Sequence, residues 1–156
     1  MRRAEQEITN HREIDALLRE GSLCHLGLMD EGIPYVVPVT YGYDGESLYI
    51  HSAMEGRKMD LLRTNPMVCF EITPQWSLVP GKRGCDWTAS YESVIGWGRA
   101  WFVDNHESKL AAFEIILQQV NPGQPHTFSP DIVSKTAVIR IDIANVTGKR
   151  SQVELL

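Results

Sequence analysis

Residues 22–53, SLCHLGLMDEGIPYVVPVTYGYDGESLYIHSA, decide the fold of this chain. They contain three strand-like stretches, at 23–29, 34–43 and 47–51, separated by DEGI at 30–33 and by the dipeptide Asp44-Gly45. Glycine permits the left-handed backbone that tight hairpins need, and Asp-Gly is a strong hairpin signal. The stretch therefore predicts three consecutive antiparallel strands.

The rest of the chain adds further strands and a few helices to this core. Strand patterns recur at 67–73, 91–103 and 135–149, whereas helical patterns cover 9–21, 56–66 and 104–120. The segment 74–90, with its prolines and glycines, predicts a long ordered loop. Because strands do not alternate regularly with long helices, the order favours a mainly β fold with flanking helices, an antiparallel barrel, over a doubly wound parallel sheet. Residues 1–156 are expected to form one domain.

The first and last of these helices carry their own start signals. Asn10 with Glu13, and Asp104 with Glu107, have the spacing of capping boxes, in which each side chain satisfies a backbone N–H of the first turn. Each is followed by an apolar stripe at helical spacing. Both helices are expected to pack on the barrel, and the 104–120 helix is interpreted as purely structural.

Composition limits the classes of function. The 156 residues carry a formal net charge of -5, with 43% hydrophobic and 22% charged residues, as in ordinary globular proteins. A general nucleic-acid binder usually shows a basic domain or stripe, so any basic site here must be local. No apolar leader and no stretch of about 20 apolar residues is present in the sequence, which favours a cytoplasmic location.

Cysteine and histidine spacing favours neither disulfides nor metal. Three cysteines at wide spacing do not form a disulfide framework, and Cys24 and Cys69 lie in apolar runs typical of buried thiols. Cys85 falls in the predicted loop. The histidines are scattered and lack the short spacings of zinc ligands, so no metal site is predicted. A nucleophilic hydrolase is also disfavoured, since Ser93 lies in no Gly-x-Ser-x-Gly elbow.

The segment HSAMEGRK, residues 51–58, places two cations where a strand ends and a helix begins. The positive end of the helix dipole usually favours acidic side chains there. Free backbone N–H groups of the helix, with Ser52, Arg57 and Lys58, would suit a phosphate monoester. Solvated basic residues at a helix start are the alternative. His51, at the strand end, is either a proton donor near a ligand ring or a structural residue.

Pro38 interrupts an otherwise buried strand. Since proline cannot donate to a ladder, this strand is expected at a sheet edge, which leaves backbone groups of Val37 and Val39 for a heteroaromatic ligand or simply unpaired. On the 91–103 strand, small residues at Gly96 and Gly98 form a face that another backbone or a flat ligand could approach.

The order and spacing of several motifs resemble those of pyridoxamine 5'-phosphate oxidase-like flavin-binding proteins, in the nitroimidazole-resistance branch. The resemblance covers nearly the whole chain and is carried by RRAEQEI, CHLGL, PYVVPVTYGYD, LYIHSAMEGRKMDLLRTNPMVCFE, CDWTASYESVIGWGRAWFV and the terminal VTGK. It implies a split β-barrel homodimer with FMN at the subunit interface. The chain departs from the pyridoxamine phosphate oxidases themselves by ending at SQVELL, which makes a role in vitamin B6 synthesis doubtful.

Residue by residue, the resemblance implies an FMN site. Ser52, Arg57 and Lys58 would hold the phosphate, while His51 and Ala53 would lie beside the cofactor. The isoalloxazine ring would be lined by Val37, Pro38, Val39 and Thr40, and the second subunit would contribute Tyr91, Ser93 and Val94.

Three functions of different classes are compatible with these observations. The first is an FMN-dependent oxidoreductase that reduces nitro-aromatic compounds such as 5-nitroimidazoles toward amines, with His51 as the catalytic residue. The second is a flavin- or haem-binding carrier or sensor, in which His51 or His25 would ligate haem iron. The third is a ligand-free interaction protein.

Overall fold

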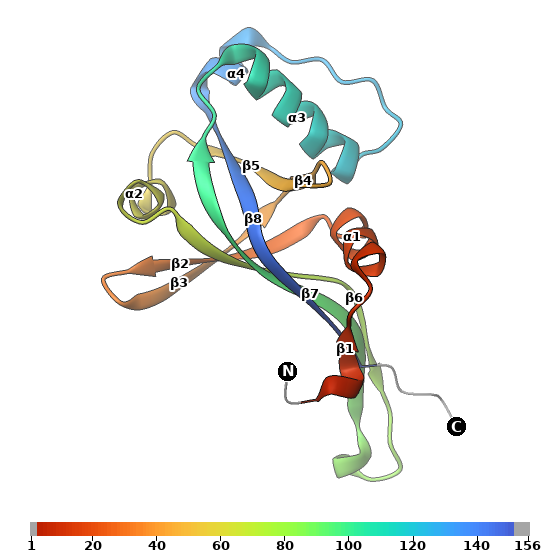
Figure 1. Cartoon of the computed structure of the whole chain (residues 1–156). Coiled ribbons are helices and arrows are strands. Elements are labelled where there is room, and N and C mark those ends of the chain that lie inside the picture. The colour runs from red at the N-terminus through yellow and green to blue at the C-terminus, as the bar shows by residue number, and fades with distance from the viewer. Residues whose placement is uncertain (1–2, 152–156) are drawn as a thin grey trace.

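One antiparallel sheet organises the molecule, as Figure 1 shows for the computed structural model, which describes residues 3–151. Its strands follow the order β3-β2-β6-β7-β8-β5-β4, with β1 paired to β8. The sheet curls so that β3 approaches β5 at its other end. The predicted fold class, an antiparallel barrel with flanking helices, is confirmed.

The first half of the chain follows the predicted hairpins. Glu31 and Gly32 turn the chain at φ 49° and 88°, and Gly45 makes the next turn at φ 111°. The predicted strand 34–43 is divided at Tyr41, which is fully buried and donates its hydroxyl to the Leu18 carbonyl at 2.7 Å. The elements are η1 (Ala4–Gln6), β1 (Glu7–Ile8), α1 (His11–Glu20), β2 (Leu23–Asp30), β3 (Ile33–Thr40), β4 (Gly42–Tyr43) and β5 (Ser47–Ala53).

The middle of the chain corrects the predicted loop at 74–90. After α2 (Arg57–Thr64), β6 runs over Met67–Val79 and β7 over Thr88–Phe102, and they form a long hairpin. Only residues 80–87, with the short helix η2 (Gly84–Asp86), lie between these strands. Pro74 fits because the β6–β7 register shifts between Ile72 and Gln75, so the ladder needs no N–H there.

The last third contains α3 (His106–Val120), α4 (Pro130–Lys135) and β8 (Thr136–Ser151). The α3 cap was predicted one residue early. Asn105, not Asp104, accepts the hydrogen bond from the Ser108 N–H, at 3.0 Å. For α1, Asn10 is the N-cap as predicted and accepts from the Arg12 N–H. The helix α4 was not predicted.

Two separate apolar clusters hold these elements together. The larger fills the barrel, with Leu26, Phe70 and Ile139 among its fully buried members. The smaller lies between β8 and the helices α3 and α4, and contains Phe113 and Val138. Alternate residues of β8 therefore face different clusters. Figure 1 shows α3 and α4 at one end of the sheet, and the β6–β7 hairpin extending from the other.

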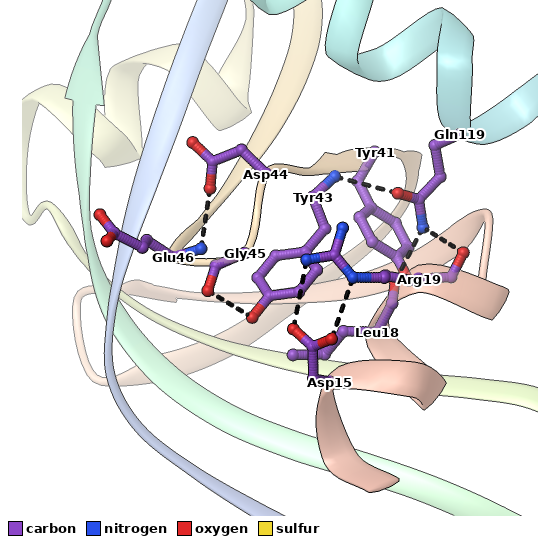
Figure 2. Close-up of polar contacts among 9 residues, drawn as sticks. All are labelled: Asp15, Leu18, Arg19, Tyr41, Tyr43, Asp44, Gly45, Glu46 and Gln119. Carbon is purple, nitrogen blue, oxygen red and sulfur yellow. Dashed lines mark hydrogen bonds and ion pairs between the residues drawn. The ribbon is translucent and has the colours of Figure 1, made fainter. Parts of the chain in front are cut away.

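Gln119 of α3 joins α1 to the β4 turn, as Figure 2 shows. Its side-chain amide donates to the carbonyls of Leu18, Arg19 and Gly21, at 2.7, 3.1 and 2.5 Å, and accepts from the Tyr43 N–H at 3.0 Å. The last carbonyls of a helix have no partner within it, so Gln119 satisfies groups that α1 cannot satisfy alone.

The predicted burial of two cysteines is confirmed for Cys24 and wrong for Cys69. Cys24 is buried, Cys69 half-buried and Cys85 exposed, and all three are free thiols. Cys69 is on the outer side of its strand, between the inward-facing Val68 and Phe70. Within residues 3–151, no helix is long and apolar enough to cross a membrane.

Candidate cofactor site

The end of β5 presents His51 and Ser52 on opposite sides of the strand. His51 is paired with Val138 of β8, and its ring lies 6.4 Å from the Phe113 ring of α3, tilted by 45°. Phe113 in turn stacks on Phe128, with centroids 5.7 Å apart. The imidazole therefore borders the smaller apolar cluster. Phe113 was not predicted at the site, because its helical spacing indicated only packing.

The surroundings of His51 favour its neutral form. Burial is the main cause that lowers the pKa of His51 from its ordinary value of 6.5, and the positive charge of Lys58 lowers it further. Burial also lowers the pKa of Lys58 from its ordinary value of 10.5. Both shifts have burial as their largest cause, and the charge of Lys58 is a smaller contribution to the His51 pKa.

The N-terminus of α2 has the features of an anion site. Gly56 precedes the helix at φ 119°, and no described side chain caps it. The Met59 and Asp60 N–H groups bond back to the Gly56 carbonyl, which leaves the first-turn N–H groups of Arg57 and Lys58 for an acceptor outside the helix. No atom of the described residues lies within 4 Å of the point where a Cβ on Gly56 would stand, so the space there is open.

Arg57 already has partners, which the sequence did not predict. Its guanidinium donates from Nε and Nη2 to Oδ2 of Asp30, at 2.9 and 2.6 Å, and lies 4.5 Å from the centroid of the Tyr35 ring. Asp30 ends β2 and Tyr35 lies in β3, so Arg57 ties α2 to the β2–β3 hairpin. Its side chain remains 58% exposed, and three of its five N–H donors point elsewhere.

The ring-lining prediction falls on β3, which has β2 as its one hydrogen-bonded neighbour and is an edge strand as predicted. Val37 and Val39 face the barrel, where Val39 is 8% exposed. Pro38 and Thr40 face outward. A ligand beside β3 would therefore contact Pro38, Thr40 and the backbone, rather than the Val39 side chain. Ala53, also exposed, ends β5.

The residues expected from a second subunit lie elsewhere in the same chain. Tyr91, Ser93 and Val94 are on β7, where Tyr91 pairs with Trp76 and Val94 with Ile72 of β6. The structure corrects the expectation for Val94: strand alternation turns its side chain inward, where it is fully buried. Tyr91 is half-buried, and Ser93 is 9% exposed.

Of the two alternatives expected for the face around Gly96 and Gly98, another backbone or a flat ligand, the structure shows protein atoms there, including the backbone of β8 at Gly98. A Cβ on Gly96 would lie 2.2 Å from the Phe70 ring, and one on Gly98 would lie 2.4 Å from the Asp142 carbonyl oxygen. These glycines allow close packing inside the barrel. Within residues 3–151 no group of three or more His, Cys, Asp or Glu side chains could hold a metal ion, and His25 pairs with Glu71 at 3.0 Å.

Comparison with known proteins gives the chain a family. Residues 10–150 match the family model described as pyridoxamine 5'-phosphate oxidase. An uncharacterized protein of Rhizobium meliloti (strain 1021) is 30% identical over 104 residues, and the match spans 58% of this chain and 66%, just under two thirds, of that relative's length.

Solved structures share the fold. A candidate 5-nitroimidazole antibiotic resistance protein from Bacteroides thetaiotaomicron is 30% identical, with a TM-score of 0.82 over 92% of this chain and 86% of that chain. The flavocytochrome Anf3 of Azotobacter vinelandii gives a TM-score of 0.85 at 22% identity, over 100% of this chain and 74% of its own. The FAD and heme binding protein of Mycobacterium smegmatis gives 0.85 at 18% identity, over 95% and 74%. The last two similarities concern the fold alone.

Proposed function

Because the chain belongs to the pyridoxamine 5'-phosphate oxidase family, we propose that it is an FMN-dependent oxidoreductase that acts as a homodimer and reduces nitro-aromatic compounds. The flavin part of this proposal is supported by the structural neighbours, several of which bind flavins. The acceptor is supported by the 30% identical protein described with 5-nitroimidazole resistance.

The observation that carries the cofactor proposal is the uncapped start of α2. Two backbone N–H groups without helical partners, beside the cations Arg57 and Lys58, favour a phosphate at this point. The open space at Gly56 leaves room for one. Riboflavin and FAD differ from FMN at this end of the molecule, so the same site would discriminate among them.

The residues of the chain fit the rest of a flavin mononucleotide. Ser52, Arg57 and Lys58 would hold its phosphate. Pro38, Thr40 and the backbone of β3 would border the ring along the free edge of that strand. A bound flavin supplies the redox chemistry, and the protein supplies orientation and electrostatics.

His51 is the catalytic residue we propose. Its low pKa keeps the imidazole neutral near pH 7, with one ring nitrogen as hydrogen-bond donor and the other as acceptor. A neutral imidazole can hold a proton at one nitrogen near an acceptor group without adding a full charge beside the cations of α2. His51 is exposed on its other side, and the Phe113 ring borders it at 6.4 Å.

The homodimer is supported by an apolar outer face of the sheet. Cross-strand pairing places Val36, Gly27, Cys69 and Trp97 in one row across β3, β2, β6 and β7. Val36 is 58% exposed and Trp97 46%. Met67, Ile95 and Trp101, at 48, 40 and 45%, extend the face. Such a surface is typical of an interaction site, and a second copy would cover it symmetrically.

The dimer is tested by the molar mass in solution, measured by light scattering. Trp97→Lys should shift the protein toward the monomer, since it places a charge on the apolar face. Ile132→Lys is the matched control, because Ile132 is 65% exposed on α4, outside that face. A wild-type monomer, or equal effects of the two substitutions, would refute this interface.

The cofactor and the activity are tested together. The visible spectrum is recorded for protein purified without added cofactor, and again after incubation with FMN and desalting. A retained two-band flavin spectrum supports the proposal, whereas a Soret band favours the haem-binding alternative. Flavin-loaded protein is then reduced and mixed with a 5-nitroimidazole. Failure to pass electrons to any nitro-aromatic acceptor would leave a flavin-binding protein without this activity.

A further inference from the structure

Apart from the α2 site, a polar groove lies on the outer side of the sheet, where η1 meets β7 and β8. It has a volume of ≈ 330 Å³, and its lining includes Arg3, Tyr91 and Lys149. Thr88 and Ser151 add hydroxyl groups. The groove therefore combines two cations, an aromatic ring and hydroxyl donors, which is the chemistry that recognises a phosphorylated ring compound.

The contacts between these residues define the groove more closely. The Lys149 ammonium lies 5.4 Å from the centroid of the Tyr91 ring, a cation–π arrangement. Lys149 is also the direct cross-strand partner of Ser93, so the two side chains share one face of the sheet. Tyr91 and Ser93 are the two residues expected to contact a cofactor from the second subunit, and Lys149 joins them although nothing in the sequence analysis assigned it.

The charge of the groove is positive. No carboxylate is among the residues that line it, and neither Arg3 nor Lys149 forms an ion pair with another residue in the described range 3–151. On β1, Glu7 is the cross-strand partner of Lys149, so one carboxylate flanks the groove. Two cations with one flanking carboxylate leave a net charge of about +1.

The charge of the α2 site alone does not balance that of a phosphate. Arg57 and Lys58 contribute two positive charges, and Asp30, bonded to Arg57, removes one. A phosphate monoester carries about −1.5 to −2 near pH 7. One further positive charge is needed for balance, and the described residues of the α2 site do not provide it.

The groove continues the face proposed for the dimer. Tyr91, Ser93, Ile95 and Trp97 alternate along β7 on its outer side, so the groove begins where the apolar surface ends. In the proposed dimer, a second copy that covers Ile95 and Trp97 therefore borders Tyr91 and Lys149.

We propose that Lys149, supported by Arg3, donates charge-assisted hydrogen bonds to the phosphate of the flavin held by α2 of the partner subunit. This inference rests on the proposed function and adds to it a residue in trans. Each cofactor site then contains Arg57 and Lys58 from one protomer and Lys149 from the other, and neither protomer alone balances the phosphate.

Binding measurements test the role of the charge. Lys149→Gln should weaken FMN by about tenfold and riboflavin much less, because only FMN carries the phosphate. Arg12→Gln, which removes one positive charge from the exposed first turn of α1, outside both the groove and the α2 site, should change neither affinity. If wild-type protein binds FMN and Lys149→Gln binds it equally well, this inference is wrong while the proposed function stands. If wild-type protein binds no flavin, both are wrong.

A mixed dimer tests the action in trans. One tagged chain carries Arg57→Gln, the other carries Lys149→Gln, and the doubly tagged dimer is isolated. If Lys149 acts across the interface, both lesions fall in one site and the other site is intact, so half the sites should bind FMN with wild-type affinity. If Lys149 acts within its own chain, each site has one lesion and no site keeps that affinity, which would overturn the inference.

Discussion

Arg57 donates two hydrogen bonds to one oxygen of Asp30, which connects the first turn of α2 to the end of β2. The ion pair fixes the direction of the guanidinium before any ligand arrives. The Asp30 carboxylate also neutralises part of the positive charge of Arg57. Arg57 should therefore bind a phosphate less strongly than an unpaired arginine would.

Replacement of Arg57 by alanine should weaken FMN about tenfold to a hundredfold and riboflavin far less, because the lost partner is a phosphate-binding cation. Fluorescence titration with both flavins measures the ratio. Arg63→Ala is the control, since Arg63 is in the last turn of the same helix and pairs with Asp60. Equal loss for the two flavins would remove this role from Arg57.

The low pKa of His51 predicts a pH effect on stability. Its folded-state pKa lies below the ordinary 6.5. At a pH between the two pKa values, His51 therefore binds more protons in the unfolded chain than in the folded protein. The stabilisation is complete above about pH 6.5 and is lost as the pH falls through the folded-state pKa. Urea unfolding from about pH 5 to pH 8 should show a weaker decrease at low pH in His51→Gln than in wild type.

The titration of His51 itself separates the two causes. Lys58→Met removes a nearby positive charge and should raise the His51 pKa, as followed by NMR of the imidazole protons. Lys82→Met, which removes a charge from the connection between β6 and β7 at the other end of the sheet, should leave it unchanged. An unaltered midpoint in Lys58→Met would assign the whole shift to burial.

Gln119 should be important for stability although it lies outside the cofactor site. Gln119→Ala removes a partner from the Leu18, Arg19 and Gly21 carbonyls and from the Tyr43 N–H, although Leu18 keeps the Tyr41 hydroxyl. The change should cost about 2–4 kcal/mol of unfolding free energy. The neighbouring Gln118 bonds only to the exposed Glu114 among the described residues. Gln118→Ala should therefore cost less than about 0.5 kcal/mol in the same denaturant series.

Gly96 should tolerate no side chain. An alanine Cβ would meet the Phe70 ring at 2.2 Å inside the barrel, and the required repacking should cost about 1–3 kcal/mol or more. Gly27→Ala is the control, because a Cβ there meets its nearest neighbour at an ordinary 3.5 Å. Comparable melting temperatures for the two variants would contradict this assignment of Gly96 to packing.

Local signals in the sequence predicted the hairpins, the edge position of β3 and the cap of α1. They failed at 74–90, where prolines and glycines indicated a loop but a register shift lets β6 continue past Pro74. They also missed α4, which is only six residues long and is held mainly by Val133 in the smaller cluster. Short elements that depend on tertiary packing leave little periodicity to read.

The candidate site was predictable in position but not in its contacts. The order HSAMEGRK places cations at a helix start, and the structure has them there. The partners of those residues come from distant segments: Asp30 for Arg57, and Phe113 for His51. Such pairs depend on how the sheet curls, and sequence spacing does not encode them. Lys149 was missed for the same reason, since its neighbour Tyr91 is remote in the chain.

The free edge of β3 has a further consequence for how the protein behaves at high concentration. Pro34, Val36 and Pro38 occupy alternate positions, and both prolines pair with β2 without supplying an N–H. Their nitrogens are on the side away from β2, where a strand of another molecule would need donors. Strands of other molecules therefore pair poorly with this edge, which limits polymerisation through the sheet. The protein can thus keep an exposed edge beside its site.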